Sequence, residues 1–409
     1  MPGQTQNMPF AIDARMLGRE GTGVATYAAA LETALTLSGI DPIRITDPSC
    51  GRPMERAGRI ARWTRWAKAL ADRPRILSHA GDTFRGRDIF RLAQVHFDRH
   101  GTLLRLRVPG AGGIVHWTYP LPIRIEGWTN IYTVHDAIPI FHPALSQIDP
   151  VRHRRLLGVL ADSAEHLLTV SEAARRDIIA AIGCAPDTLT ACPPGLDIAP
   201  SDVPLPLGLE PGGFLLFVGS VEPRKNLLRL VEAHRRAGLS LPLVIAGPDG
   251  WRSDDIAPQL AAAPGVIRLP YVDRPTLVAL LAAARALVFP TITEGFGLPI
   301  IEAMQLGTAV LTSRGGATEE VAGGSALLAD PLSIEEMAGQ IARLTDDATV
   351  AALADAGRAR GAAFTTTAFA ARLAAVHGRL AKLVGAYGAS PSGDQALGAV
   401  RGNNINGPA

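Results

Sequence analysis

The sequence predicts an α/β protein of two domains, each a parallel sheet covered by helices, and three observations support this fold class. The 409 residues suffice for two domains of ordinary size. Short apolar runs alternate with helical patterns along both halves, and such alternation is typical of parallel sheets. Residues 196–213, LDIAPSDVPLPLGLEPGG, contain four prolines and few charges, which indicates a linker between the halves.

The composition excludes several other classes of protein. With 47% hydrophobic and 19% charged residues, the chain can form large cores and is not globally disordered. Its net charge of +2 provides no bulk attraction to nucleic acid. The three cysteines have neither metal-ligand spacing nor an even disulfide set. No apolar run reaches the roughly 18 residues of a membrane span, and residues 1–15 lack a signal pattern, so we expect a cytoplasmic protein.

Apolar runs and helical patterns alternate in order along the chain. In the N-terminal half we expect strands at 10–12, 113–117, 131–134, 166–170 and 188–192, and helices at 24–35 and 171–182. In the C-terminal half we expect strands at 214–218, 243–246, 266–269, 286–289 and 309–312, and helices at 226–238, 275–284, 299–306, 334–345 and 365–382. Neither half has a G-x-G-x-x-G sequence after its first strand, which argues against a dinucleotide-dependent oxidoreductase.

Polar residues follow several predicted strands of the N-terminal half, where open α/β sheets place their ligands. A glycine-rich loop at Gly21–Gly23 precedes the first helix, and it is either a flexible connection or a close approach to a ligand. His116 and the pair His135–Asp136 also follow strands, and either histidine could instead be buried with backbone partners. Ser171 begins a helix and can cap it.

A second glycine-rich loop, residues 290–298, is associated with two glutamates eight residues apart. Glu294 lies on the loop, and we expect Glu302 in the first turn of the following helix. Free amides at a helix start suit phosphate, and carboxylates suit sugar hydroxyls, so the pattern fits a nucleotide sugar. An acid near a helix start is also common on ordinary surfaces, and such loops occur without a phosphate site.

A third candidate loop is FVGSVEPRKN, residues 217–226. Here the chain leaves a strand at Gly219, and Arg224 and Lys225 come just before a helix. Two cations beside a helix start suit a diphosphate. An exposed Arg–Lys pair without a ligand is the alternative.

The string E-G-F-G-L-P-x-x-E at 294–302 resembles the signature of the retaining glycosyltransferases of family 4, and T-G-V, T-V-H-D, T-V-S-E and E-P-R-K-N extend the resemblance along the chain. The resemblance implies the GT-B fold, in which two Rossmann-like domains face each other across a cleft. It then divides the chain into an N-terminal acceptor-side domain at 1–195, the linker at 196–213, a nucleotide-sugar domain at 214–364, a helix at 365–385 that crosses back, and a disordered tail at 386–409.

The same resemblance implies roles for individual residues. Catalytic roles fall to His135 beside the sugar, to Lys225 and Arg224 on the diphosphate, and to Glu294 on the sugar hydroxyls, while Glu302 would bind the ribose. The chain has Ser220 where many members have an arginine, which leaves Lys225 as the main diphosphate ligand. The remaining substrate-binding positions are Gly21, Thr22, Gly23, Asp136, Ser171, Gly219, Tyr271, Val272, Phe296, Gly297 and Leu298.

The resemblance implies a retaining α-glycosyltransferase that moves a sugar from a nucleoside diphosphate to a polysaccharide or lipid-linked oligosaccharide. GDP-mannose is the favoured donor, because the motifs look most like the mannosyltransferase branch. No D-x-D sequence occurs, so we expect side-chain cations rather than a metal to neutralise the diphosphate, and no cofactor. The alternatives are a glucan-synthase-like transferase and a non-catalytic sugar-nucleotide-binding subunit.

Residues 51–76 are strongly basic, with Trp63 and Trp66 interleaved among arginines. Such a helix can lie on an anionic membrane surface, which would place the protein peripherally on the inner face of the cell membrane. A solvated basic face without a partner explains the pattern equally well.

Overall fold

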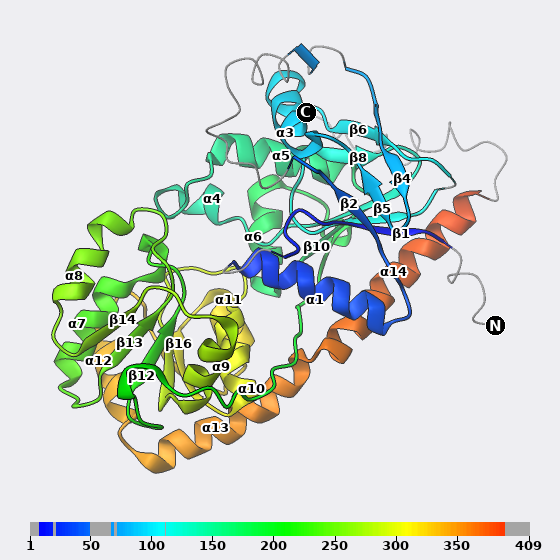
Figure 1. Cartoon of the computed structure of the whole chain (residues 1–409). Helices are drawn as coiled ribbons and strands as arrows, with labels where there is room; N and C mark the ends of the chain where they lie inside the picture. Colours follow the sequence, from blue (N-terminus) through cyan, green and yellow to red (C-terminus); the bar gives the residue numbers. More distant parts are fainter. Residues whose placement is uncertain (1–7, 19–21, 50–66, 69–71, 111, 389–409) are drawn as a thin grey trace, which may run out of the picture.

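The computed structural model of the chain confirms the predicted α/β class with parallel sheets (Figure 1). An eight-stranded sheet lies in the N-terminal half and a six-stranded sheet in the C-terminal half. The structure describes residues 8–18, 22–49, 67–68, 72–110 and 112–388, with side chains as far as 380 at the C-terminal end.

The N-terminal sheet is parallel apart from its last pair, β4 and β5, which run antiparallel. Its order β11-β10-β9-β7-β1-β2-β5-β4 reverses direction between β1 and β7, where such sheets place ligands. Every residue of β1, β7 and β9 is buried, as expected for strands covered on both faces. The strands are β1 (Phe10–Asp13), β2 (Ile43–Thr46), β4 (Ser78–Ala80), β5 (Thr83–Arg85), β7 (Ile114–Trp117), β9 (Thr129–Thr133), β10 (His166–Thr169) and β11 (Leu189–Ala191).

Helices of the N-terminal half cover this sheet and carry its candidate residues at their starts. Thr22 is the N-cap of the first helix, and Ser171 is the N-cap of α6, so the predicted capping role of Ser171 is confirmed. The helices are α1 (Gly23–Leu37), α3 (Ile89–His100), α4 (Ile138–Phe141), α5 (Pro150–Ser163) and α6 (Glu172–Ile182).

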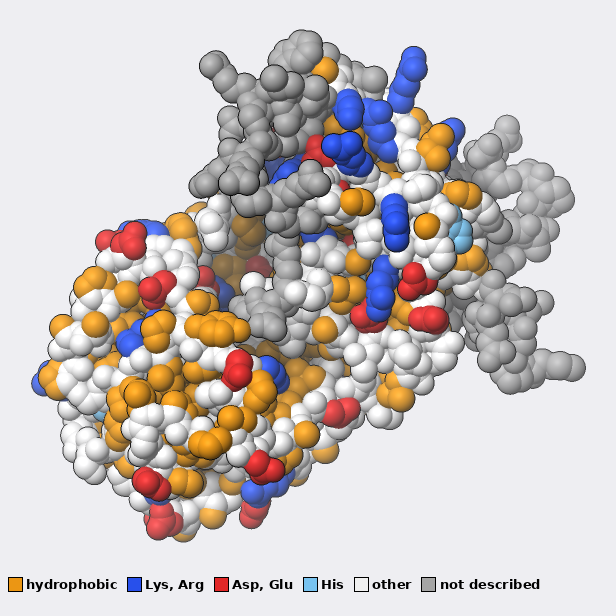
Figure 2. All heavy atoms as spheres, viewed as in Figure 1, with side chains coloured by type: hydrophobic (Ala, Val, Ile, Leu, Met, Phe, Trp, Pro, Cys, Tyr) orange, Lys and Arg blue, Asp and Glu red, His pale blue; other side chains and the backbone are white. Residues whose placement is uncertain are grey.

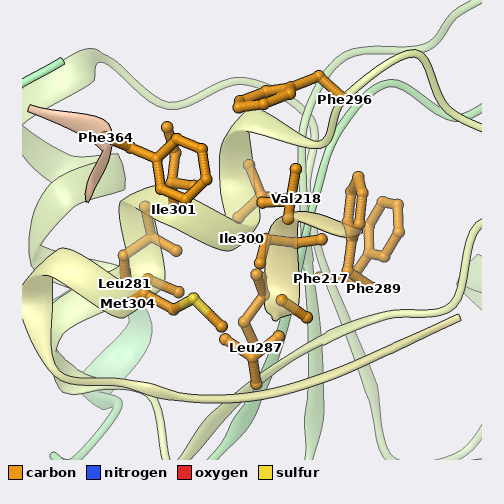
Figure 3. Packing of buried hydrophobic residues seen from close by; sticks show 14 of the residues in the cluster. Phe217, Val218, Leu281, Leu287, Phe289, Phe296, Ile300, Ile301, Met304 and Phe364 are labelled. Atoms are coloured by element: carbon orange, nitrogen blue, oxygen red, sulfur yellow. The ribbon is translucent and has the colours of Figure 1, made fainter. Parts of the chain in front are cut away.

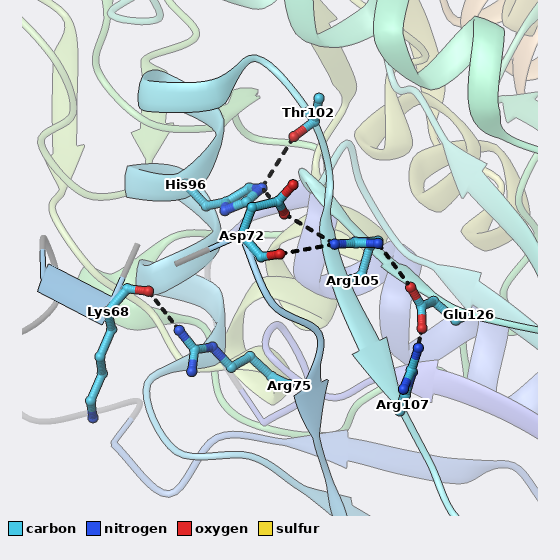
Figure 4. Close-up of polar contacts among 8 residues, drawn as sticks. All are labelled: Lys68, Asp72, Arg75, His96, Thr102, Arg105, Arg107 and Glu126. Carbon is cyan, nitrogen blue, oxygen red and sulfur yellow. Dashed lines mark hydrogen bonds and ion pairs between the residues drawn. The ribbon is translucent and has the colours of Figure 1, made fainter. Parts of the chain in front are cut away.

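A small parallel sheet of β3 (Arg75–Ile76), β6 (Leu104–Arg107) and β8 (Ile123–Ile125) lies outside the predicted elements. In β6 the leucines are buried, and Arg105 and Arg107 point outward to Glu126, at 3.5 Å and 2.5 Å (Figure 4). Lys and Arg side chains gather on this half in Figure 2. The predicted membrane-binding segment 51–76 lies mostly outside the described residues, and its role stays a prediction.

The C-terminal sheet is parallel throughout, in the order β14-β13-β12-β15-β16-β17. Its direction reverses between β12 and β15, so the loops that follow these two strands meet at one edge. The strands are β12 (Leu215–Val218), β13 (Leu243–Ala246), β14 (Val266–Leu269), β15 (Ala286–Phe289), β16 (Ala309–Ser313) and β17 (Leu327–Ala329). The helices are α7 (Leu227–Ala237), α8 (Ala257–Ala262), α9 (Arg274–Ala283), α10 (Leu298–Leu306), α11 (Gly316–Ala322), α12 (Ile334–Arg343) and α13 (Asp347–Gly361).

Helix α10 packs into the core of this half through Ile300, Ile301 and Met304, all fully buried (Figure 3). This core face matches the prediction from the apolar spacing. The predicted start of the helix is wrong by one residue, which moves Glu302 from the first turn to the beginning of the second. The helix begins at Leu298, directly after Gly297 in the left-handed region at φ 109°, and Glu302 is therefore its fifth residue.

The last helix, α14 (Thr366–Gly388), packs against the N-terminal half. Phe369 lies 5.9 Å from Tyr27 between ring centroids, and His377 lies 4.9 Å from Phe10. Residues 386–388 of the predicted tail form the end of this helix, and 389–409 lie outside the described residues. None of the described helices is both long and apolar enough to cross a membrane.

His377 is an unusual contact residue because it is buried and both ring nitrogens lack a hydrogen-bond partner. Its ring also lies 5.7 Å from that of His116, itself fully buried with Nε2 bonded to Thr133 Oγ1 at 2.8 Å. His116 is thus a core residue. Burial lowers the pKa of His377 to about 4, so the folded protein holds this ring neutral.

We predict that the His377→Leu variant loses less of its free energy of unfolding in mild acid than the wild type does. The unfolded chain protonates this histidine near pH 6.5 and the folded chain only near pH 4, so its contribution is complete above pH 6.5 and falls as the pH drops. Between these two pKa values, the contribution of His377 to the free energy of unfolding changes by about 1.4 kcal/mol per pH unit, or about 2 kcal/mol between pH 6.5 and 5. Denaturant unfolding of both proteins at these pH values measures it.

The variant has to be compared with the wild type, because Asp13 contributes to the pH dependence of stability in the opposite direction. Burial raises the pKa of Asp13 to about 6. Equal pH dependence in His377→Leu and wild type would contradict the assignment.

Candidate active site

Loops at the carboxyl ends of the two large sheets meet each other across the halves. A Cβ atom placed on Gly295, in the loop after β15, would lie 2.6 Å from the carbonyl oxygen of His135, after β9. A Cβ atom on Gly23, at the start of α1, would lie 3.8 Å from Leu298 at the start of α10. Only glycine at 295 permits the first approach, so the residue type itself sets how closely the halves meet.

A largely buried charge cluster lies at the edge shared by β12 and β15. Lys225 Nζ is 2.7 Å from Glu294 Oε1, and Arg224 Nη1 is 2.5 Å from Glu294 Oε2. Arg224 Nη2 also donates to Glu222 Oε1 at 2.6 Å. The structure therefore brings together three of the four residues predicted to be catalytic.

Burial and charge oppose each other in this cluster. Burial raises the pKa of Glu294, but the charges of Arg224 and Lys225 outweigh it and hold that pKa below its ordinary value. Burial also lowers the pKa of Lys225, which is 8% exposed, against the pull of Glu294. The carboxylate is thus ionised at neutral pH, and the two cations are concentrated where water is largely excluded.

The backbone fixes the direction of both cations. Asn226, the next residue, adopts a left-handed conformation at φ 61°, which asparagine tolerates better than most residues. Its Nδ2 donates to the carbonyls of Pro290 at 3.0 Å and Pro331 at 2.6 Å. The amide of Ile292 donates to the carbonyl of Arg224 at 2.9 Å. The loop at 217–226, here called the cation loop, and the loop at 290–298, here called the glutamate loop, are therefore joined as one unit.

Glu302 stands apart from this cluster in its contacts. Its carboxylate lies 2.8 Å from Arg274 Nη1 and is 6% exposed. Burial raises the pKa of Glu302, and Arg274 only partly offsets this. Arg274 begins α9, shortly after Tyr271 and Val272, the residues predicted to meet the nucleotide base. Tyr271 is 63% exposed. Glu302 thus lies near the predicted base-binding segment through Arg274.

His135 lies in the N-terminal half, across from the charge cluster of the C-terminal half. A chain of buried polar groups holds it in place. Its Nε2 donates to the carbonyl of Thr118 at 2.9 Å, and Thr118 Oγ1 donates to Asp13 Oδ2 at 3.0 Å. Burial lowers the pKa of His135, so the ring is neutral at neutral pH. With the proton on Nε2, Nδ1 is a hydrogen-bond acceptor. Asp136 Oδ1 accepts from the amide of Ile138 at 2.9 Å.

Two further contacts tie the halves together at the start of α6. Ser171 Oγ donates to the carbonyl of Gly295 at 2.8 Å and accepts from the amide of Ala174 at 3.0 Å. Glu320 of α11 accepts from the amides of Glu172 at 2.8 Å and Ala173 at 2.7 Å. A carboxylate at a helix N-terminus is favoured by the dipole and by the unpaired amides. We call these contacts of Ser171 and Glu320 the interdomain clasp.

The other predicted residues differ in what they leave available for a ligand. Thr22 Oγ1 accepts from Ala25 at 3.2 Å, and Gly219 has φ 147° beside Lys225. The side chain of Phe296 packs on Phe364 in the core, which leaves only its backbone for a ligand (Figure 3). Gly21 lies outside the described residues.

Sequence reasoning missed Asp13, Thr118, Arg274 and Glu320. Asp13 directly follows the first predicted strand, at 10–12, and this position at a strand end could have drawn attention to it. Glu320 is 148 residues from its partner at Glu172, and no local pattern indicates such a pairing. Among the described residues, no group of three or more His, Cys, Asp or Glu side chains is placed to hold a metal ion.

Comparison with known proteins shows similarity to glycosyltransferases. Residues 208–360 match the family model of glycosyl transferases group 1. The O-antigen chain mannosyltransferase B of Escherichia coli is 35% identical over 249 residues, which cover 56% of this chain and 63% of that protein. A D-inositol 3-phosphate glycosyltransferase of Acidothermus cellulolyticus is 30% identical over 274 residues, which cover 59% and 61%. The chain thus spans about three fifths of the length of these curated relatives.

Solved structures show the same GT-B fold of two Rossmann-like domains. A sucrose-phosphate synthase from Thermosynechococcus elongatus superposes with a TM-score of 0.65 at 20% identity, covering 92% of this chain and 100% of its own. WaaG, a glycosyltransferase involved in lipopolysaccharide biosynthesis, gives a TM-score of 0.59 at 17% identity, covering 90% and 99%. HepE of Anabaena, solved with UDP and glucose, gives 0.62 at 15%, covering 91% and 100%.

We predict that Glu320→Ala opens the N-terminus of α6 to solvent. The change removes two hydrogen bonds to a charged acceptor, each worth about 1.5–3 kcal/mol, so amide exchange at residues 172–173 should accelerate at least about tenfold. Hydrogen–deuterium exchange with mass spectrometry of the 171–176 segment measures this.

The neighbouring Glu319 offers a matched control, because its carboxylate accepts from the amide of Gly315 within its own half, at 2.6 Å. Glu319→Ala should leave exchange at 172–173 unchanged. If both variants, or neither, accelerated exchange there, the clasp would not be what protects the helix start.

Proposed function

We propose that the protein is a retaining α-glycosyltransferase that transfers a hexose from a nucleoside diphosphate to a saccharide acceptor. The observation that carries the proposal is the pair of half-buried Arg224 and buried Lys225 at the switch point of the C-terminal sheet, facing the His135 loop. A diphosphate carries two or more negative charges, and two cations in a site largely closed to water neutralise them strongly. The match of residues 208–360 supports the same class of reaction.

In the proposed reaction, the diphosphate competes with Glu294 for its cations. Without donor, Glu294 and Glu222 balance Arg224 and Lys225. When the diphosphate takes these cations, Glu294 becomes available to accept from the sugar hydroxyls. His135, neutral and fixed through Thr118, offers Nδ1 to another hydroxyl. Attack comes from the leaving-group side, and a donor phosphate oxygen takes the proton of the acceptor.

We propose mannose as the sugar and GDP as the carrier. Support comes from the likeness to the E. coli mannosyltransferase, whereas HepE was solved with UDP, so the base requires a direct test. Thermal-shift measurements with GDP-, UDP- and ADP-sugars distinguish the carriers. The proposed acceptor is a polysaccharide or a lipid-linked oligosaccharide, in line with the O-antigen assigned to that relative by its name.

We predict separate kinetic effects for the two ends of the donor. Lys225→Ala should lower kcat about 100-fold or more, because it removes a charge that stabilises the leaving diphosphate. Glu302→Ala should raise the KM for GDP-mannose about tenfold with a smaller effect on kcat, since it removes a ribose ligand. Steady-state release of GDP measures both constants.

Arg235→Ala provides the control for removing one positive charge, because Arg235 is exposed on α7 and pairs only with Glu232 among the contacts described. Its constants should match those of the wild type. Full activity in Lys225→Ala would refute the proposed diphosphate site, and absence of any turnover by the wild type with all three donor classes would favour the non-catalytic alternative.

We also predict that excess EDTA leaves the rate of transfer unchanged within about twofold, because Arg224 and Lys225 supply the positive charge that a divalent ion supplies elsewhere. The assay compares chelated protein with and without added Mg²⁺ or Mn²⁺. A rate that disappears with EDTA and returns with the metal would show that the side-chain cations are not sufficient.

A further inference from the structure

A pocket of about 340 Å³ lies between the halves, beside the charge cluster. Its volume is at the lower end of the range for small-molecule sites, which is enough for a sugar residue. One wall comes from the segment after β9 and the other from the loops after β12 and β13. The residues on which the argument rests are Asp136, Gln147 and Ile148 on the first wall and Glu222, Arg224 and Trp251 on the second.

Trp251 is the one aromatic side chain among the residues lining this pocket, and its turn is rigidly placed. The amide of Gly250 donates to the carbonyl of Val221 at 3.0 Å, and Val221 pairs with Asp249 in a short bridge. A Cβ atom on Gly250 would lie 3.1 Å from Ser220 Cβ, so the turn packs directly on the cation loop. The backbone that carries Trp251 is therefore held against the loop that carries Arg224.

The chemistry of the lining matches a sugar better than an apolar ligand. A sugar ring has an apolar face of C–H groups and an edge of hydroxyls. Trp251 supplies an aromatic surface for such a face, while Asp136, Glu222 and Gln147 supply acceptors for hydroxyls, and Arg224 and Gln147 supply donors. This combination of one aromatic surface and convergent polar groups is typical of small-molecule sites.

The pocket adjoins the proposed reaction centre on both sides. Arg224, in its wall, contacts Glu294 at 2.5 Å. Asp136, in the opposite wall, is so close to the glutamate loop that a Cβ atom on Gly295 would lie 3.2 Å from its Cβ. A sugar in the pocket would thus lie next to the donor rather than in the donor site, whose nucleoside end we place at Glu302.

We propose that this pocket binds the sugar residue of the acceptor that receives the transferred hexose, and that Trp251, contributed by the donor-binding half, is its stacking platform. Only the role of the bound sugar as an acceptor rests on the proposed function. The existence of a saccharide site that spans the two halves and depends on one tryptophan does not rest on it.

Saturation-transfer difference NMR with the full chain tests the site without requiring turnover. The probes are octyl α-D-mannopyranoside and octyl α-D-glucopyranoside, without donor. We expect saturation of the ring protons of at least one probe by the wild type, about tenfold weaker binding with Trp251→Ala, and binding within about threefold of wild type with Trp251→Phe, which keeps an aromatic face.

Phe141→Ala is the matched control, because Phe141 is a 45%-exposed aromatic residue on nearby α4 that does not line the pocket. It should bind the probes like the wild type. The proposal is overturned if the wild type saturates neither sugar ring, if only the octyl chains are saturated, or if Trp251→Ala binds as well as wild type with an unchanged melting temperature.

Failure of the pocket and failure of the proposed function give different results. If thermal shifts detect no nucleotide sugar but the ring protons are saturated in a Trp251-dependent way, the saccharide site stands and the transferase proposal falls. If GDP-mannose binds and turns over but no ring is saturated, the transferase proposal stands and this pocket is not the acceptor site.

Discussion

The site depends on one largely buried carboxylate held between two cations. Glu294 can be ionised in a largely closed site only because Arg224 and Lys225 approach both of its oxygens. Removing one partner of such a pair typically costs about 3–5 kcal/mol, since the remaining charge is left without compensation. The same interaction therefore stabilises the protein and, in the proposed reaction, keeps two cations ready for an anionic ligand.

The topology explains why these three residues meet. Each half of the chain reverses its strand order once, and each reversal leaves a gap at the carboxyl ends of two parallel strands. The cation loop and the glutamate loop follow the two strands that flank the gap in the C-terminal sheet. Asn226 then joins them by bonding to Pro290. Neither loop has to be rigid alone, because each is fixed by the other.

Local patterns allowed much of this to be predicted, and their limits are physical. The apolar spacing of Ile300, Ile301 and Met304 predicted the buried face of α10, because such spacing reflects burial directly. The start of α10 was misplaced because Gly297, rather than Pro299, sets it. The strand β6 was missed since its alternating arginines resemble a solvated surface. Long-range contacts of Glu320 leave no local pattern at all.

The clasp and the charge cluster are linked through a single peptide unit. Ser171 binds the carbonyl of Gly295, and Gly295 directly follows Glu294, whose carboxylate holds both cations. In the proposed reaction, a diphosphate that takes these cations changes the partners of Glu294 and acts on the residue next to the interdomain hydrogen bond. In the proposed reaction, we therefore expect charge at the donor site and contact between the halves to be coupled. Such coupling is a physical reason for building a transfer site from two domains rather than within one.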